Sequence, residues 1–428
     1  MKEIVDKLKQ TLRDPQLKRK IIFTLAIILF FRIFAFIPVS VIDLPRLKTL
    51  FSQSQFLSLL DIFSGGTLVN FSLMALGLNP YINASIIFQL LTVLFPQLEK
   101  LAKEGEYGKF KINQYTRFLT VPLTIVQAGG IYLLLQNQKI IGQLSILEFV
   151  TFISTLVAGT FILMWFGELI SEFGLGNGIS LLIFVGIVGR IPVLIGKTAS
   201  VFTPEALFSV VVFLLVSVLV IASVVFINEA VRRIPVYYAK RIKGNKMYQG
   251  ATNYLPLKLN QAGVIPIIFA VSFVLFPQLI GNFLMYAKQP VVAQTAKFIA
   301  QLFQPSGIVY NGLYFLLVIG FTFFYTIVVF SPGKIADEIQ KHGGFIPGIR
   351  PGSMTKQYLE GILYRITSVG ALFLGAIAIL PVIVSRVTGL ENLVIGGTGI
   401  LIVVSVVLET FKTIESQLVM KSYDKYSR

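Results

Sequence analysis

The chain has 428 residues, of which 55% are hydrophobic and 13% charged, with a net charge of +17 and a mean hydropathy of +0.79. Soluble globular domains carry about 25% charged residues, so this composition excludes a soluble fold and indicates a lipid environment. The sequence has no cysteine, which excludes disulfides and thiolate metal sites. Its one histidine, His342, has no evident partners for a Ser-His-Asp relay. It therefore predicts no catalytic residue, no metal and no cofactor.

The first predicted element is a short amphipathic helix. Ile4, Leu8 and Leu12 recur at a spacing of four residues among lysines, and the pattern ends at Asp14-Pro15. One apolar stripe on a basic helix predicts an element lying on the membrane surface.

Ten long apolar runs follow. Because an α-helix rises about 1.5 Å per residue, about 20 residues cross the hydrocarbon core. The sequence thus predicts an all-α, polytopic membrane protein with ten transmembrane helices, near 21–40, 73–95, 118–135, 150–170, 179–195, 208–228, 262–285, 310–330, 365–385 and 394–410.

Five predicted spans lie on each side of an external link at 196–207. An odd number of spans per half places the halves in opposite orientations, which is typical of inverted repeats. We therefore predict two pseudo-symmetric inverted halves, residues 1–200 and residues 201–428.

The segment at 59–70 is too short and too polar to span the membrane. It contains Asp61, Ser64, Gly65 and Gly66. Taken by itself, this composition indicates an external loop between the first two spans.

Basic residues set the orientation. If the N-terminus is inside, 28 of the 37 Lys and Arg residues lie in the cytoplasmic segments, so both termini are predicted to be cytoplasmic. The cytoplasmic loop at 229–261 carries Arg232, Arg233 and Arg241, and its residues alternate as strands do around Lys243–Lys246. This pattern predicts a β-hairpin.

The cytoplasmic loop at 331–360 begins with Ser331-Pro332, which predicts a short helix ending near His342. Pro-Gly pairs at 347–348 and 351–352 favour two successive tight turns, which would hold Arg350 outward as a contact residue. That Arg350 is an ordinary solvated residue remains the alternative.

Several motifs, taken together, resemble the SecY/Sec61-alpha family of protein-export channels in its bacterial form. They occur in family order from the family's plug to its tenth helix, at 65–66, 76–91, 103–106, 115–117, 165–168, 176–180, 262–266, 343–352 and 396–398. This resemblance implies a passive, non-enzymatic channel that moves unfolded secretory polypeptides across the bacterial inner membrane and releases membrane-protein helices sideways into lipid.

The resemblance also implies roles for particular residues. It identifies 59–70 as a re-entrant plug helix and places a ring of aliphatic side chains at the waist of the pore. The ring consists of Leu78, Ile82, Ile179, Ile183, Ile268 and Ile402. Periodicity alone would assign these six residues to ordinary helix packing.

Asn83 and Gln127 match the family's lateral gate, although a structural hydrogen bond between buried amides is an equal alternative. The resemblance further implies SecE and SecG subunits, the SecA motor ATPase, the translating ribosome, signal peptides, nascent chains and lipids as partners. The docking residues would be Arg350, Arg232, Arg233 and Arg241.

Two other classes of protein fit part of the pattern. A secondary transporter also has ten spans and inverted halves, but transporters usually carry ionisable residues at the midplane, and Arg32 is the clear case here. A scaffold without a conduit would not need the re-entrant segment.

Overall fold

The computed structural model describes most of the chain. The described residues are 14–39, 44–53, 57, 61, 64–138, 140–192, 196, 207–238, 241–243, 246–248, 252–285, 289–305, 307–388 and 396–426. The predicted surface helix at Ile4, Leu8 and Leu12, most of the 196–207 link and several residues of the predicted plug lie outside them.

The described residues contain a helix at each of the ten predicted spans. These helices are α2 (Pro15–Ala35), α5 (Asn79–Leu94), α7 (Glu106–Asn137), α8 (Ile146–Phe173), α9 (Gly178–Val188), α11 (Leu207–Glu229), α12 (Ile265–Leu284), α14 (Ile308–Val329), α16 (Ser353–Thr388) and α17 (Gly396–Tyr426). By length and apolarity, five helices of the described chain are able to cross a membrane, or six if the bent pair α5 and α6 is one span. The shorter helices are α3 (Leu44–Gln53), α6 (Pro96–Lys103), α13 (Pro290–Leu302) and α15 (Pro332–Lys341).

The chain forms two compact units. The first contains Met1–Leu207, Ser272–Tyr310 and Val406–Arg428, and the second contains Phe208–Val271 and Asn311–Ser405. The division into inverted halves at residue 200 stays a prediction.

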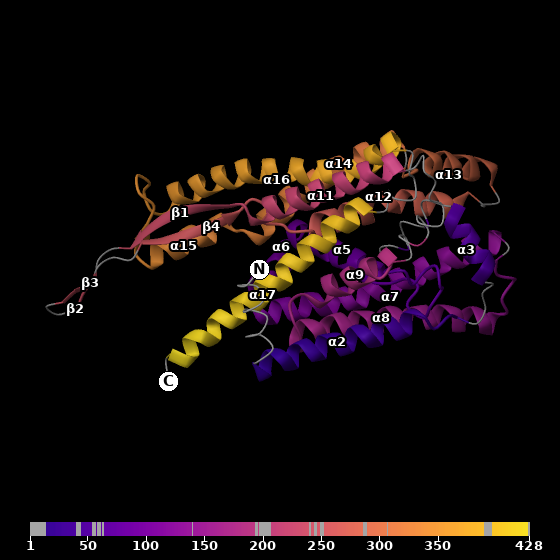
Figure 1. The fold of residues 1–428 in the computed structure, drawn as a ribbon, viewed down its shortest axis with the longest axis horizontal. Coiled ribbons are helices and arrows are strands. Elements are labelled where there is room, and N and C mark those ends of the chain that lie inside the picture. Colours follow the sequence, from indigo (N-terminus) through magenta and orange to yellow (C-terminus); the bar gives the residue numbers. More distant parts are fainter. Residues whose placement is uncertain are drawn as a thin grey trace. The chain divides into compact units, whose positions relative to one another are not determined.

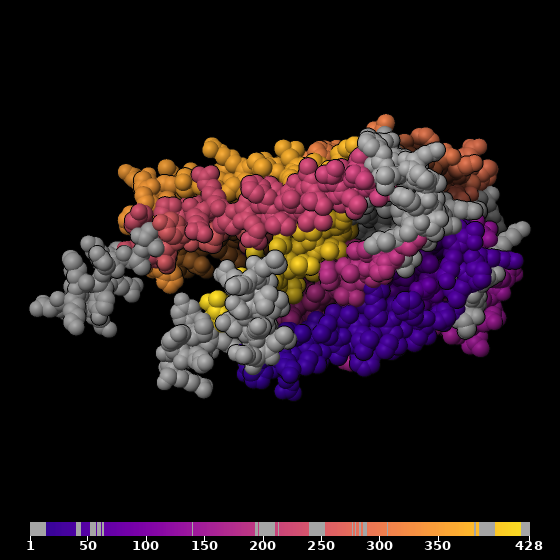
Figure 2. Space-filling view, in the orientation of Figure 1, coloured from indigo at the N-terminus to yellow at the C-terminus, as the bar shows by residue number. Residues whose placement is uncertain are grey.

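In the first unit, α2 packs on α8, α8 packs on α7 and α9, and α7 packs on α5 (Figure 1). Local sequence explains where two of these helices begin. Ser145 and Glu148 form a reciprocal capping box at the start of α8, and the side chain of Asn177 accepts hydrogen bonds from the first turn of α9. Figure 2 shows α2, in indigo, at the surface, where it exposes Leu25 and Leu29, as a lipid-facing helix does.

The second unit contains two small sheets. In the larger sheet, strand β1 (Val231–Tyr238) pairs antiparallel with β4 (Thr252–Lys258), and β5 (Gly344–Phe345) pairs with the other edge of β1. In the smaller sheet, β2 (Arg241–Lys243) pairs antiparallel with β3 (Lys246–Tyr248), which confirms the predicted hairpin. The short strand β5 was not predicted.

An apolar cluster joins the larger sheet to α15 and α16. Its buried members are Ile234, Val236, Leu257, Ile339, Ile346, Leu359, Ile362 and Ile366. The cluster gives the loops at 229–261 and 331–360 a core of their own, so they form a folded platform.

The predicted short helix and turns are confirmed in the loop between α14 and α16. α15 has Ser331 as its N-cap, although the serine side chain makes no capping hydrogen bond, and it ends before His342. Gly348 and Gly352 have φ values of 79° and 96°, which only glycine adopts readily and which successive turns require.

Candidate plug and pore-lining site

The segment before α5 folds into consecutive turns. The backbone N–H of Gly66 and the hydroxyl of Ser64 both donate to the carbonyl of Asp61, at 2.8 and 2.9 Å, and the hydroxyl of Thr67 donates to the carbonyl of Ser64 at 2.8 Å. These turns continue to Leu78, so the helix of the predicted span near 73–95 begins later than predicted, at Asn79. The predicted bounds of the plug, 59–70, stay a prediction. Glycines and small polar residues bond to nearby backbone here instead of extending the helix.

The end of this segment is tied to the chain that follows α2. The N–H of Val39 donates to the carbonyl of Phe71 at 3.0 Å, and the N–H of Leu73 donates to the carbonyl of Ile37 at 3.1 Å. The ring of Phe71 also stacks on Phe152 of α8, with centroids 5.7 Å apart. The plug segment, which we define as Asp61 and residues 64–78, is thus held at its C-terminal end by backbone and aromatic contacts.

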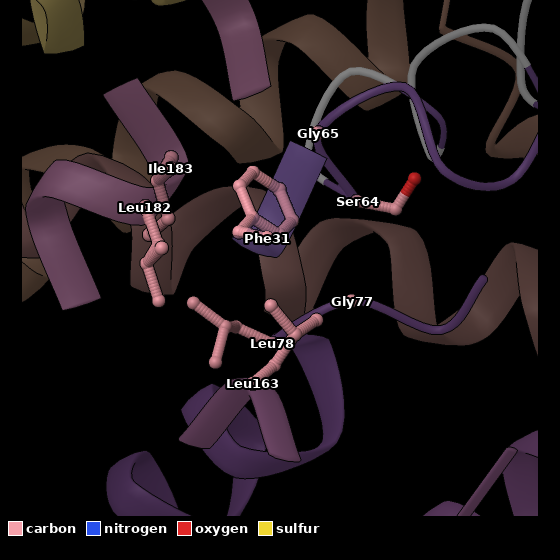
Figure 3. Close-up of a pocket in the computed structure, with 8 residues that line it drawn as sticks. All are labelled: Phe31, Ser64, Gly65, Gly77, Leu78, Leu163, Leu182 and Ile183. Carbon is pink, nitrogen blue, oxygen red and sulfur yellow. The ribbon is translucent and has the colours of Figure 1, made fainter. Parts of the chain in front are cut away.

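A small cavity lies where this segment meets the helices around it (Figure 3). Its volume is about 10 Å³, close to the space that one water molecule occupies. The lining residues are mostly apolar: Phe31, Ser64, Gly65, Gly77, Leu78, Leu163, Leu182 and Ile183. The structure therefore brings two predicted plug residues, Ser64 and Gly65, together with two predicted ring residues, Leu78 and Ile183.

The predicted ring residues of the first unit lie at the beginnings of two helices. Leu78 is the N-cap of α5, and its carbonyl accepts a hydrogen bond from the N–H of Ile82 at 2.9 Å. Leu78, Ile82 and Ile183 are buried, and Ile179 in the first turn of α9 is partly buried. Ile268 in α12 and Ile402 in α17 are buried residues of the second unit.

Two arginines that the predicted site did not include are found near the C-terminal end of α9: Arg190 follows this helix, and the side chain of Arg32 reaches it from α2. Arg190 forms an ion pair with Asp61, and Arg32 of α2 donates a hydrogen bond to the carbonyl of Val185. Arg32 stood out in the sequence as a charge within an apolar span. Arg190 also lies inside a predicted span, 179–195, but no sequence pattern relates it to Asp61, which is far away along the chain.

Comparison with known proteins decides the family. The family model described as SecY matches residues 72–411, which include most of the predicted spans. The chain belongs to the SecY family.

The relatives agree over nearly the whole chain. Protein translocase subunit SecY of Mycobacterium bovis and that of Corynebacterium glutamicum are each 43% identical to this chain, and each match covers 97% of the chain and 98% of the relative. That of Streptomyces coelicolor is 41% identical over the same shares.

Solved structures show the same fold. The chain matches "The structure of a protein conducting channel" with a TM-score of 0.62 at 18% identity, covering 95% of this chain and 93% of the other. It matches Sec61 in a canine ribosome-channel complex with a TM-score of 0.59, also at 18% identity and over the same shares. The SecY family consists of non-enzymatic channel subunits, so the motif-based recognition and the all-α, ten-span fold are confirmed.

The two predicted gate residues lie on neighbouring helices of the first unit. Asn83 is partly buried in α5, and Gln127 is buried in α7. Within the described part of this SecY-family chain, no hydrogen bond joins the two amides. The gate role of these residues and the structural alternative both remain predictions.

The predicted docking residues lie on the platform of the second unit. Arg350 is exposed, and its carbonyl accepts a hydrogen bond from the hydroxyl of Thr355 at 2.9 Å. Arg232 and Arg233 are exposed on β1, and Arg241 lies in β2. The exposed guanidinium groups are available to an acidic or phosphate-bearing partner.

Proposed function

We propose that this chain is the central subunit of a protein-conducting channel in the bacterial cytoplasmic membrane. It moves unfolded secretory polypeptides across the membrane and releases the helices of membrane proteins sideways into lipid. The observation that carries this proposal is the packing of a re-entrant plug segment beside Leu78 and Ile183 in a chain of the SecY family.

The six aliphatic ring residues form the constriction of this channel. A pore wide enough for an extended polypeptide leaks ions unless its narrowest point excludes water, and an apolar constriction does this by dewetting. The cavity that Leu78 and Ile183 line with the plug segment is only about 10 Å³, so these residues pack closely against the plug segment.

Sideways exit uses a seam that Asn83 and Gln127 border. An amide near lipid favours partners that can satisfy its hydrogen bonds, so a weak polar contact there opens at modest cost when an apolar signal helix replaces it. This role depends on the gate assignment by family motif.

Partners supply the energy, because the proposed conduit is passive. We propose that the SecA motor or the translating ribosome docks on the platform, with Arg350, Arg232, Arg233 and Arg241 as contacts, and that SecE and SecG complete the complex. The guanidinium fork suits both carboxylates and RNA phosphates. The N- and C-termini face the cytoplasm, as the distribution of basic residues suggests.

A secondary transporter does not fit this chain. The matched relatives are named protein translocase subunits, and the matched structures are protein-conducting channels. Arg32, the charged residue within the first span, donates a hydrogen bond to the carbonyl of Val185 near the C-terminal end of α9.

Site-specific crosslinking tests the conduit. A photoreactive residue at Ile82 or Ile183 in membranes is expected to crosslink to a stalled secretory chain, and only when that chain carries its signal sequence. Absence of a crosslink from both positions, with the chain engaged and the channel folded, would overturn the pore assignment.

A further inference from the structure

Asp61 is fully buried, and both oxygens of its carboxylate have partners. Oδ1 accepts a hydrogen bond from the N–H of Val69 at 2.7 Å, which closes the plug segment on itself. Oδ2 forms an ion pair with Nη2 of Arg190, which follows α9. One carboxylate therefore both shapes the plug segment and joins it to a transmembrane helix.

The arginine side chain also lies across the plug backbone. A Cβ added to Gly66 would lie 3.2 Å from Nε and 3.3 Å from Cγ of Arg190. The neighbouring Gly65 meets α9 directly, because a Cβ added there would lie 3.1 Å from the Cα of Gly186. The ion pair is thus the polar part of a closely packed contact between the plug segment and α9.

The position of Arg190 explains how a buried carboxylate is tolerated. The last carbonyls of α9 carry partial negative charge, which favours cations at this end. Arg32 already donates to one of these carbonyls, that of Val185, and Arg190 follows the last turn of the same helix. The guanidinium of Arg190 forms its ion pair with the carboxylate of Asp61.

We propose that the Asp61–Arg190 ion pair holds the plug segment against α9 in the closed channel, and that Arg190 is a plug-positioning residue. This rests on the proposed function, since a plug needs a fixed position only where it closes a pore. Removing one member of a buried ion pair leaves an uncompensated charge, which is strongly unfavourable. The plug segment therefore stays against α9 until the pore widens and water reaches the ion pair.

The two members of the pair are not equivalent. Asp61 has an exposed side-chain fraction of 0%, whereas that of Arg190 is 22%. Arg190→Gln leaves the fully buried carboxylate of Asp61 without a counter-charge. Asp61→Asn leaves the guanidinium of Arg190 without its carboxylate, but this side chain can still be stabilised by solvent and by the carbonyls at the end of α9. Arg190→Gln is therefore expected to release the plug segment more than Asp61→Asn does.

Thiol labelling tests this in the full channel complex. The chain has no cysteine, so Leu68→Cys, at a plug position only 4% exposed, adds the single thiol of the chain. In reconstituted vesicles we expect Arg190→Gln to raise the labelling rate of this thiol by a membrane-impermeant maleimide about tenfold or more. We expect Asp61→Asn to raise the rate less. The double variant should be labelled more slowly than Arg190→Gln, because it leaves no charge unpaired.

Arg117→Gln is the matched control. It breaks an ion pair with Glu168, at 2.7 Å, that joins α7 to α8. It should leave the labelling rate unchanged, and an equal rise would show general loosening and overturn the proposal. A wild-type labelling rate in folded Arg190→Gln would also overturn it, and if that variant does not assemble, a wild-type rate in Asp61→Asn would do the same.

A translocation assay separates this proposal from the proposed function. If the Leu68→Cys protein moves a signal-bearing chain and the pair variants do not speed labelling, only the role of the ion pair fails. If the parent chain without substitutions moves no such chain with its partners present, the proposed function itself fails.

Discussion

Gly65 of the plug segment and Gly186 of α9 meet backbone to backbone: a Cβ added to Gly186 would lie 2.4 Å from the Cα of Gly65. Non-bonded carbon atoms pack at about 3.5 to 4.0 Å, so the contact excludes any side chain at 186. Glycine within a helix costs about 1 kcal/mol relative to alanine. Gly186 therefore lowers the local stability of α9, but it allows the backbone of this helix to contact the plug segment.

Gly186→Ala tests this contact. The added methyl group favours the helix but prevents close approach, so we expect labelling of a thiol at Leu68→Cys to speed up several-fold. Gly129→Ala in α7 is the matched control, because a Cβ added there meets nothing within 4 Å. Equal labelling rates in the two variants would show that the glycine contact does not seat the plug segment.

Hydropathy was sufficient to predict a helix at each of the ten long apolar runs, but not the short helices α3, α6 and α13. The bilayer requires about 20 apolar residues per crossing, so spans such as α8 and α14 can be found from composition alone. The hairpin in the loop at 229–261 was also predictable, because its residues alternate around the turn at 243–246. These features are local, and each depends on one continuous stretch of sequence.

Contacts between distant residues were not predictable in this way. The Asp61–Arg190 ion pair joins a turn to the end of a helix, and no periodicity relates the two positions. β5 is two residues long, too short for a strand pattern, and pairs only because Phe345 lies beside Tyr237 of β1. The roles assigned to the ring, gate and docking residues came from family resemblance and remain predictions.

Leu78→Ala and Leu163→Ala separate pore closure from packing. Both leucines are buried and line the same small cavity, so each truncation should lower stability by about 2 to 5 kcal/mol. Only Leu78 belongs to the predicted ring, and we expect only its truncation to raise ion conductance across the resting channel in a planar bilayer. Comparable conductance from the two variants would argue against Leu78 as a ring residue.

Asn260 is a buried residue at the centre of a partly buried hydrogen-bond network in the second unit. Its amide donates to the side chain of Asn228 at 2.9 Å and to the carbonyl of Gly263 at 3.2 Å, and it accepts from the N–H of Gly263 at 3.0 Å. Asn228 donates in turn to Ser405 of α17 at 3.0 Å. The network fixes the chain just before α12, the helix that carries Ile268.

Asn260→Ala should therefore destabilise the second unit. The change removes partly buried hydrogen bonds to Asn228 and Gly263, each of which contributes about 0.5 to 1.5 kcal/mol. We expect a lower unfolding temperature in detergent, measured by circular dichroism. Asn253→Ala, at an exposed position of β4, is the matched control. Equal shifts in both variants would mean that the network adds nothing to stability.

Arg350→Glu tests the docking platform. Arg350 is exposed on turns whose geometry depends on Gly348, Gly352 and the hydrogen bond from Thr355, so the substitution should leave the fold intact. A charge-assisted hydrogen bond contributes about 1.5 to 3 kcal/mol, so reversing this charge should weaken SecA or ribosome binding about tenfold or more. Lys341→Glu, an equal charge change at an exposed position of α15, should weaken it far less. Equal losses would indicate that partners respond to the overall charge of the platform rather than to a contact at Arg350.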